Sequence, residues 1–366
     1  MNGQLSLRSC ALALLVVCLE CAAALNAAAA QIELFAGGGE IEQNAPATRC
    51  RLIQPFGFEF LPDGSAVIVE MVSSNRVLKV DPAGKLTVIA GGGPKGFSGD
   101  GGPARAAAFN GMHNLAISPK GDIFLADTWN YRVRKIDAQT GGITTIAGTG
   151  KKGFGGDGGR AVEADFSSII NIALAPSGWH LYVADIENRR VRRIDMASGV
   201  VTSVAGDGRK GVPADGAEAK SAPLIDPRAV APGADGSFYI LERSGHALRL
   251  VDAAGKIRTV AGTGMPGLGG DGGKAIEAQL NGPKHICLGG DGSVFIADSE
   301  NHCIRRFDPM SGKIERVAGT GRKGPGIVRG SPLAVALDQP HGVTVGKDGS
   351  LYIVDSHNNR ILRLVK

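Results

Sequence analysis

The chain has 366 residues, 43% of them hydrophobic, and a formal net charge of +5. This apolar content is sufficient for a packed core and argues against a disordered chain. The positive charge is modest and spread along the sequence, which disfavours binding to nucleic acid, because phosphate recognition needs a concentrated basic face.

The first 30 residues are expected to be a signal peptide. Arg8 gives a short basic start, an apolar run covers Ala11 to Leu25, and Ala28–Ala30 offer a small-residue cleavage site before Gln31. The apolar run is too short, and too rich in alanine at its end, for a membrane-spanning helix. We therefore expect a secreted or periplasmic protein without a membrane span, with one mature domain over residues 31–366.

The rest of the chain is built from one repeated unit. Its clearest copy has a strand ending at Asp127, an alternating strand over Arg132–Asp137, a strand over Ile143–Ala147 and a Gly-rich segment. Alternating apolar and polar residues between Gly and Asn are typical of short antiparallel strands. An acidic residue ends the second strand of every copy, at intervals of 56 to 58 residues by subtraction: Glu70, Asp127, Asp185, Glu242, Asp298 and Asp355.

Six copies with four strands each predict an all-β fold, a six-bladed β-propeller of four-stranded antiparallel blades. The blades share one ring, so the domain is single despite its length. An unpaired strand over Ile32–Ala36 precedes the first copy, and the sixth copy ends at Lys366 without an outer strand. We expect this N-terminal strand to complete the C-terminal blade, because a closed ring exposes no sheet edge.

The run Asp127-x-x-Asn130-x-Arg132, which has close counterparts in other copies, resembles the NHL repeat. The Ala-Gly-Thr-Gly and Gly-Asp-Gly-Gly-x-Ala runs resemble the bacterial and teneurin-type versions of this repeat. The resemblance covers Ile32 to Lys366 and implies a propeller fold. It does not assign a function, because this fold hosts enzymes, receptors and RNA-binding modules.

One position differs from blade to blade at the start of the inner strand, which lines the central channel. The residues there are Phe56, His113, Ile170, Arg228, Lys284 and His341. We expect these six side chains, called the ring below, to surround the mouth of the channel, where such folds usually bind ligands. Trp129 and His357 lie in turns on the same face and are candidate walls for a sugar or an aromatic ligand.

Two kinds of chemistry fit the ring. It resembles the channel mouth of peptidylglycine amidating lyase, where three His on alternate blades hold a catalytic zinc, and His113 and His341 match two of those positions. The third position holds Arg228, which stays protonated and cannot ligate a metal, whereas catalytic zinc normally has three protein ligands. Alternatively, Arg228 and Lys284 bind a carboxylate or sulfate, with His113 or His341 as general acid–base.

Intact Gly-Asp-Gly-Gly segments occur at Asp100, Asp157 and Asp271. One interpretation is a calcium site, in which the carboxylate and backbone carbonyls surround the ion. The other is that each Asp caps a short helical turn, such as the one expected over Pro103–Ala108.

Ionic pairs are expected to hold each blade together. The acidic residue that ends the second strand is followed by an arginine that begins the third strand. The expected pairs are Asp127 with Arg132, Asp185 with Arg190 and Asp355 with Arg360. Because these residues recur in several blades, we assign them a structural role.

Three cysteines remain after the signal peptide. Cys287 and Cys303 lie on the first and third strands of one blade, and a strand between them separates them by about 10 Å, too far for a disulfide. Cys50 lies in a loop. An odd number of cysteines in an oxidising compartment leaves at least one free thiol or an intermolecular link.

The sequence favours an exported, monomeric binding or interaction module. Its ligand would be a small molecule, a glycan or a protein, held by the face that carries the channel mouth and the Gly-Asp-Gly-Gly loops. The alternative is a channel-mouth lyase or hydrolase, of the amidating-lyase, streptogramin-lyase or lactonase kind. His113, His341 and Arg228 would be its catalytic candidates, with or without a divalent metal.

Overall fold

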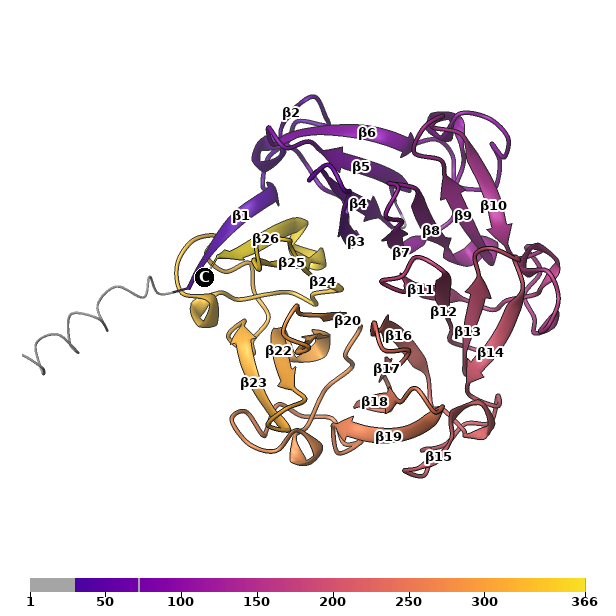
Figure 1. The fold of residues 1–366 in the computed structure, drawn as a ribbon. Coiled ribbons are helices and arrows are strands. Elements are labelled where there is room, and N and C mark those ends of the chain that lie inside the picture. Colours follow the sequence, from indigo (N-terminus) through magenta and orange to yellow (C-terminus); the bar gives the residue numbers. More distant parts are fainter. Residues whose placement is uncertain (1–29, 72, 366) are drawn as a thin grey trace, which may run out of the picture.

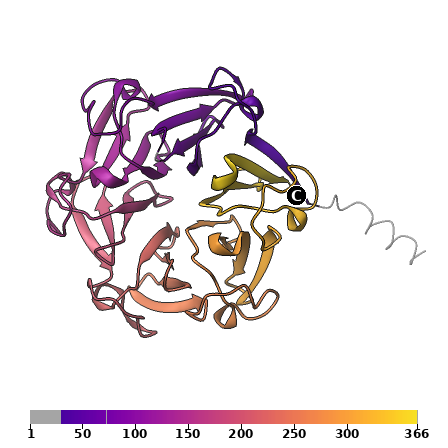
Figure 2. The same cartoon turned by 180° about the vertical axis from the view of Figure 1, so that it is seen from behind.

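The computed structural model describes residues 30–71 and 73–365. These form six antiparallel sheets, arranged as blades around a central axis (Figure 1), and the view from behind shows the same closed ring (Figure 2). The six-bladed propeller predicted from the repeat is confirmed. The predicted signal peptide lies outside the described residues, apart from Ala30. Among the described residues, no helix has the length and apolarity needed to cross a membrane.

In each blade the strands succeed one another from the channel to the rim. The strands of the first three blades are β3 (Pro55–Phe60), β4 (Ala66–Glu70), β5 (Arg76–Val80) and β6 (Lys85–Gly91); β7 (Met112–Ile117), β8 (Ile123–Asp127), β9 (Arg132–Ile136) and β10 (Ile143–Ala147); and β11 (Ile169–Leu174), β12 (His180–Asp185), β13 (Arg190–Asp195) and β14 (Val201–Ala205).

The last three blades follow the same plan. Their strands are β16 (Pro227–Pro232), β17 (Phe238–Glu242), β18 (Ala247–Val251) and β19 (Lys256–Ala261); β20 (His285–Leu288), β21 (Val294–Asp298), β22 (Cys303–Asp308) and β23 (Lys313–Ala318); and β24 (Gly342–Val345), β25 (Leu351–Asp355), β26 (Arg360–Val365) and β1 (Gln31–Gly37).

Blades one and four carry a short fifth strand that the sequence pattern did not predict. Strand β2 (Ala45–Pro46) pairs with β6, and β15 (Ala217–Glu218) pairs with β19. Both lie in the connections that lack an intact Gly-Asp-Gly-Gly turn. The connections with an intact turn make only an isolated bridge to the rim strand, as Pro103 does with Gly142.

The described helices are 3₁₀ turns of three residues. One group lies in the connections between blades, and the other follows the second strands of blades two, five and six. They are η1 (Ala47–Arg49), η2 (Ala104–Ala106), η4 (Ala161–Glu163), η5 (Ala219–Ser221), η6 (Ala275–Glu277) and η8 (Pro332–Ala334) in the first group, and η3 (Thr128–Asn130), η7 (Ser299–Asn301) and η9 (Ser356–Asn358) in the second.

The N-terminal strand closes the ring as predicted. Strand β1 pairs antiparallel with β26, from Gln31 opposite Val365 to Gly37 opposite Arg360. In Figure 1 the indigo β1 lies beside the yellow β26. Ile32 is fully buried in the core between blades five and six. The apolar side of this strand therefore anchors it, in addition to its backbone hydrogen bonds.

The hydrophobic core lies mainly between neighbouring blades. Val69 of blade one and Leu125 of blade two belong to one buried cluster, as the alternating strand pattern requires. Inner strands approach closely near the axis: a Cβ on Gly57 would lie 2.8 Å from the Leu115 side chain. Tight packing of this kind fixes the relative positions of the inner strands, which carry the ring.

Candidate functional site

The structure brings all six ring residues to one place on the propeller axis. Each is near the start of its inner strand, and together they line one small cavity: Phe56, His113, Ile170, Arg228, Lys284 and His341. The alignment of strand starts therefore located the residues that converge at the axis. The same cavity is bounded on its inner side by Asn114, Asn171 and His285.

The mouth itself is filled by the ring's own side chains. The Phe56 ring centroid lies 5.2 Å from that of His113, edge to face, and 4.1 Å from that of His341. The cavity left at the centre measures about 10 Å³, roughly the space that one water molecule needs. A ligand larger than water therefore has no room on the axis at this end of the channel.

Both ring histidines present an unprotonated Nε2. Nδ1 of His341 donates to the Gln339 carbonyl at 2.7 Å. Nδ1 of His113 lies 3.2 Å from Thr128 Oγ1, whose hydrogen goes to the Ile169 carbonyl at 2.6 Å, so the hydroxyl accepts from the histidine. Burial, together with the positive charges of Arg228 and Lys284, holds the pKa of each histidine well below its usual range. Both are therefore neutral at pH 7.

Lys284 is buried and has a carboxylate partner. Its Nζ lies 3.2 Å from Glu300 Oε1 and donates to Gln339 Oε1 at 2.9 Å. Burial lowers the pKa of Lys284 to about 8, against the opposing effect of Glu300. At neutral pH the Lys284 ammonium is therefore charged, and the Glu300 carboxylate largely compensates this charge.

Arg228, in contrast, has no polar partner among the described residues. The residue is 8% exposed, and its Nε is buried without a hydrogen bond. The nearby Asp226 carboxylate instead accepts hydrogen bonds from the Ser244 backbone and hydroxyl, at 2.8 and 2.6 Å. Burial lowers the pKa of Arg228 to about 10, so the guanidinium remains charged at pH 7. A buried, unpaired guanidinium is costly, and an anion that paired with it would remove that cost.

Beside the ring, between blades three and four, lies a groove of about 400 Å³. Ile170 and Arg228 belong to both the ring and the groove, so they form the wall between the two. Two further basic residues, Arg189 and Lys210, line the groove. Glu187, the nearest acidic neighbour of Arg189 in the chain, is paired with Lys152.

This groove was not predicted from the sequence. The ligand was expected on the axis, whereas the space that the structure leaves is displaced to one side. A signal did exist, since blade four departs from the turn consensus at Glu242 to His246. Ser244 in that turn now lines the groove and occupies the Asp226 carboxylate.

The predicted walls Trp129 and His357 both stand beside the ring histidines. The Trp129 ring lies 6.3 Å from that of His113, and the His357 ring is stacked on that of His341 at 5.7 Å. Trp129 also packs directly over Gly111, where any Cβ would clash with the indole. Lys95 Nζ lies 5.1 Å from the Trp129 ring, so a basic side chain already covers this aromatic surface.

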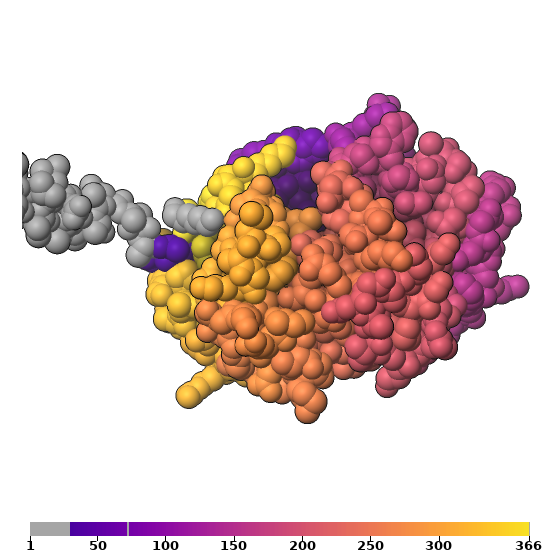
Figure 3. Space-filling view, turned by 60° about the horizontal axis from the view of Figure 1, so that its bottom comes forward, coloured from indigo at the N-terminus to yellow at the C-terminus, as the bar shows by residue number. Residues whose placement is uncertain are grey.

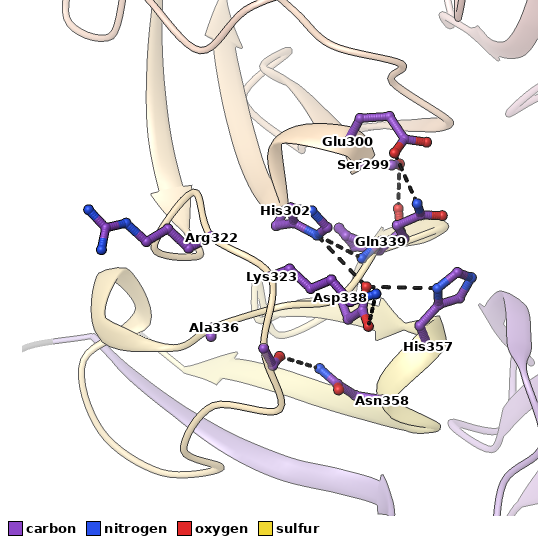
Figure 4. A network of polar contacts seen from close by, with 12 residues as sticks. Ser299, Glu300, His302, Arg322, Lys323, Ala336, Asp338, Gln339, His357 and Asn358 are labelled. Carbon is purple, nitrogen blue, oxygen red and sulfur yellow. Dashed lines mark hydrogen bonds and ion pairs between the residues drawn. The ribbon is translucent and has the colours of Figure 1, made fainter.

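A polar network around Asp338 holds the last blade's side of the mouth (Figure 4). The Asp338 carboxylate lies 3.9 Å from His302 Nδ1, 3.7 Å from His357 Nδ1 and 3.4 Å from Lys323 Nζ. The adjacent Gln339 side chain donates to Glu300. The network therefore fixes the loop that carries His341 and connects it to the partner of Lys284.

The Gly-Asp-Gly-Gly aspartates lie at the rim and pair with arginines that are fully buried. The distances from Asp100, Asp157 and Asp271 to the guanidinium groups of Arg134, Arg192 and Arg305 are 2.8, 2.7 and 2.8 Å. Their loops hydrogen-bond along the rim strand of the next blade; Gly101 N, for example, donates to the Ile143 carbonyl. These segments therefore cover the blade edge and do not face the channel.

Neither the calcium nor the helix-cap interpretation fits these contacts. A carboxylate that already binds a guanidinium is a poor calcium ligand, since the arginine supplies its counter-charge. The 3₁₀ helix over Ala104–Ala106 has no side-chain cap, so the expected capping role of Asp100 is wrong.

The pairing expected within each blade is correct in blade six and shifted in two others. Arg360 pairs with Asp355 at 2.7 Å. In blades two and three, however, the strand-end carboxylate faces the arginine two residues further on, as in Asp127 with Arg134 at 3.4 Å. Arg132 instead donates to the backbone carbonyls of Asn130 and Thr149. Alternate residues of a strand share a face, so Arg134 lies on the same side of β9 as Arg132 and can reach the aspartate in its place.

The ring does not fit a catalytic zinc. In the part of the chain that the structure describes, no three His, Cys, Asp or Glu side chains come together as a metal site. At the third alternate blade the ring presents a guanidinium, which repels a cation. The three cysteines within the described residues are free, with Cys50 and Cys303 fully buried and Cys287 partly exposed.

Comparisons with known proteins agree with the repeat. The family model described as the NHL repeat matches residues 280–307 and 337–364, within blades five and six. Protein SUPPRESSOR OF QUENCHING 1 of Arabidopsis thaliana is 28% identical over 289 residues, which are 75% of this chain and 27% of that protein. NHL repeat-containing protein 2 of Gallus gallus is 24% identical over 327 residues, 81% and 44% of the two chains. The chain spans less than half the length of these relatives.

Solved structures share the fold at low sequence identity. An auxiliary nutrient binding protein from Bacteroides thetaiotaomicron superposes with a TM-score of 0.67 at 14% identity, over 92% of this chain and 76% of the other. A streptogramin B lyase superposes with a TM-score of 0.55 at 16% identity, over 92% and 98%. The family-model matches identify NHL repeats within blades five and six, and the similarity to these solved structures agrees with the propeller fold.

Proposed function

We propose that this protein is an exported binding module that holds a small anionic ligand in the groove between blades three and four. The observation that carries the proposal is Arg228, a buried guanidinium that has no partner among the described residues and lines a 400 Å³ groove. A carboxylate or sulfate group would satisfy it through two parallel hydrogen bonds. A groove of this volume accommodates a small molecule.

The surroundings of Arg228 support an anion over a neutral ligand. Arg189 and Lys210 line the groove on its blade-three side together with Glu187, whose charge is compensated by Lys152. Asp226 also lines the groove and keeps its charge, but its carboxylate is hydrogen-bonded to Ser244 and not to Arg228. Lys284 adds a positive charge close enough to depress the pKa of both ring histidines. Ile170 and Ile186 supply an apolar surface for the body of the ligand.

The test is sulfate and citrate binding to residues 31–366, measured by calorimetry and thermal unfolding against equal ionic strengths of chloride. We expect sulfate at about 100 times its dissociation constant to raise Tm by about 4 °C. Arg228→Leu should abolish this rise. Because that change removes an unpaired buried charge, the variant should also melt at or above the wild-type temperature without ligand.

Arg243→Leu is the matched control. Arg243 is exposed and close enough to oppose the charge on Arg228, but it does not line the groove. It should keep the sulfate response, apart from a small loss of long-range attraction. An equal response in all three proteins, or none in the wild type, would refute the proposal.

A lyase remains the second candidate, on one observation. His113 and His341 are neutral and each keeps Nε2 free of hydrogen, as a general base requires. They line the ring cavity together with Arg228, which also lines the groove where a substrate would lie. If an anionic substrate is found, the decisive variant is His341→Gln. Normal binding of the substrate without its conversion to product would identify the site as an active site.

A further inference from the structure

The far end of the channel is wide, unlike the ring. A cavity of about 570 Å³ occupies it, lined by the second halves of the inner strands, from Phe60 in β3 to Val345 in β24. Figure 3 shows a hollow at the centre of the blades. Asn114, Asn171 and His285 form the boundary with the small ring cavity. The volume is typical of a small-molecule site and is independent of the groove beside Arg228.

The walls of this cavity are mainly apolar, and most of their polar groups have partners. Asn114 and Asn171 each accept a backbone N–H from the neighbouring inner strand. Thr344 donates to the Phe58 carbonyl, and Lys347 donates to the Pro62 carbonyl at 3.0 Å. The lining otherwise consists largely of Ala, Ile, Leu, Val, Phe and Pro side chains.

Glu59 is the exception. It is the one acidic residue in the lining, and among the described residues it has no cationic partner. Its carboxyl has a hydrogen bond only with the backbone of the adjacent Phe60. The other titratable groups in the lining are His285, Cys287 and Lys347, and Lys347 reaches Pro62 instead of Glu59. Burial raises the pKa of Glu59 to about 7.

We propose that the wide end of the channel is a second binding site, for an organic amine with an apolar body. The hydrocarbon part would replace water along the Leu, Ile and Val side chains. The protonated amine would pair with the Glu59 carboxylate, which no side chain among the described residues neutralises. In this apolar surrounding, such a charge-assisted hydrogen bond is stronger than in water.

The test uses 2-phenylethylamine as probe and 2-phenylethanol as its neutral counterpart, with binding measured by calorimetry on residues 31–366 at pH 8. The wild type should bind the amine at least about tenfold more tightly than the alcohol. Glu59→Gln should lose this preference while keeping the weak affinity for the alcohol. The preference should also fall in the wild type as the pH is lowered below 7, because Glu59 takes up a proton.

Two controls separate this site from others. Glu163→Gln, an exposed carboxylate paired with Arg160 at the surface, should bind the amine as the wild type does. Arg228→Leu should also keep amine binding, so failure of the anion groove leaves this result unaffected. Equal affinity of the wild type for amine and alcohol, or amine binding unchanged in Glu59→Gln, would overturn the proposal.

Discussion

At the scale of single residues, the buried arginines differ in whether a carboxylate pairs with them. Arg134, Arg192 and Arg305 are fully buried and held between a strand-end carboxylate and a rim aspartate. Arg228 is nearly as buried and has neither. The repeated, fully paired arginines hold their blades together. Arg228 occurs at a position where no other blade has an arginine, and its missing partner indicates a ligand site.

The paired arginines lead to a stability prediction. Asp298→Ala should lower the free energy of unfolding by about 3–5 kcal/mol, because it leaves the buried Arg305 without its inner carboxylate. Asp271→Asn, at the half-exposed outer end of the same pair, should cost about 1 kcal/mol. Urea unfolding measures both. A cost for Asp271→Asn that grows on adding calcium would instead restore the calcium interpretation, because the ion would stabilise the protein with the intact site.

Lys284 leads to a prediction of pH dependence. Its pKa of about 8 means that the ammonium is charged below pH 8 and loses its proton above it. Affinity for sulfate should therefore weaken as the pH rises from 7 to 9, by about two- to fivefold, since Lys284 acts from beside the ring and is partly neutralised by Glu300. In Lys284→Met the affinity should not change over this range. Titration calorimetry at several pH values distinguishes the two outcomes.

At the scale of elements, the decisive strand is β1, which belongs to a blade whose other strands come from the far end of the chain. Its pairing was predictable from the sequence, because the sixth copy of the repeat lacked an outer strand and the N-terminal strand had no blade of its own. The fifth strands β2 and β15 were not, since a two-residue pairing leaves no periodic signal. The other connections also hydrogen-bond to the rim strand, so the difference is only in the number of residues that pair.

Because β1 closes the ring, we expect Ile32 to contribute as much to stability as a rim-strand residue of a blade formed from one continuous segment. Ile143 in β10 is the matched control, because both side chains are fully buried between blades. Ile32→Ala and Ile143→Ala should each lower the free energy of unfolding by about 2–4 kcal/mol. If Ile32→Ala costs less than about 1 kcal/mol while Ile143→Ala is costly, β1 is only loosely attached.

At the scale of the whole molecule, the sequence predicted the ring residues but not the space around them. Spacing and strand alternation place Phe56, Arg228 and His341 at equivalent positions, so their convergence follows from the repeat. In the structure, Phe56 fills the mouth and Arg228 faces a groove to one side. Neither could be predicted, because both depend on side-chain directions and on contacts between blades far apart in the sequence. Glu59 was missed for a similar reason, because a lone acidic residue in a strand signals nothing until the channel is closed around it.

The pairing of Gln31 with Val365 brings the beginning and the end of the domain to a single point on the rim. A larger protein could therefore accept this propeller within one of its surface loops, because the entering and departing chains would already be adjacent. It also follows that a short linker joining these two residues would preserve every blade, and new ends could then be opened in an exposed turn on another blade. In a ring closed in this way, the chain could begin at any blade and still form the same six blades in the same cyclic order.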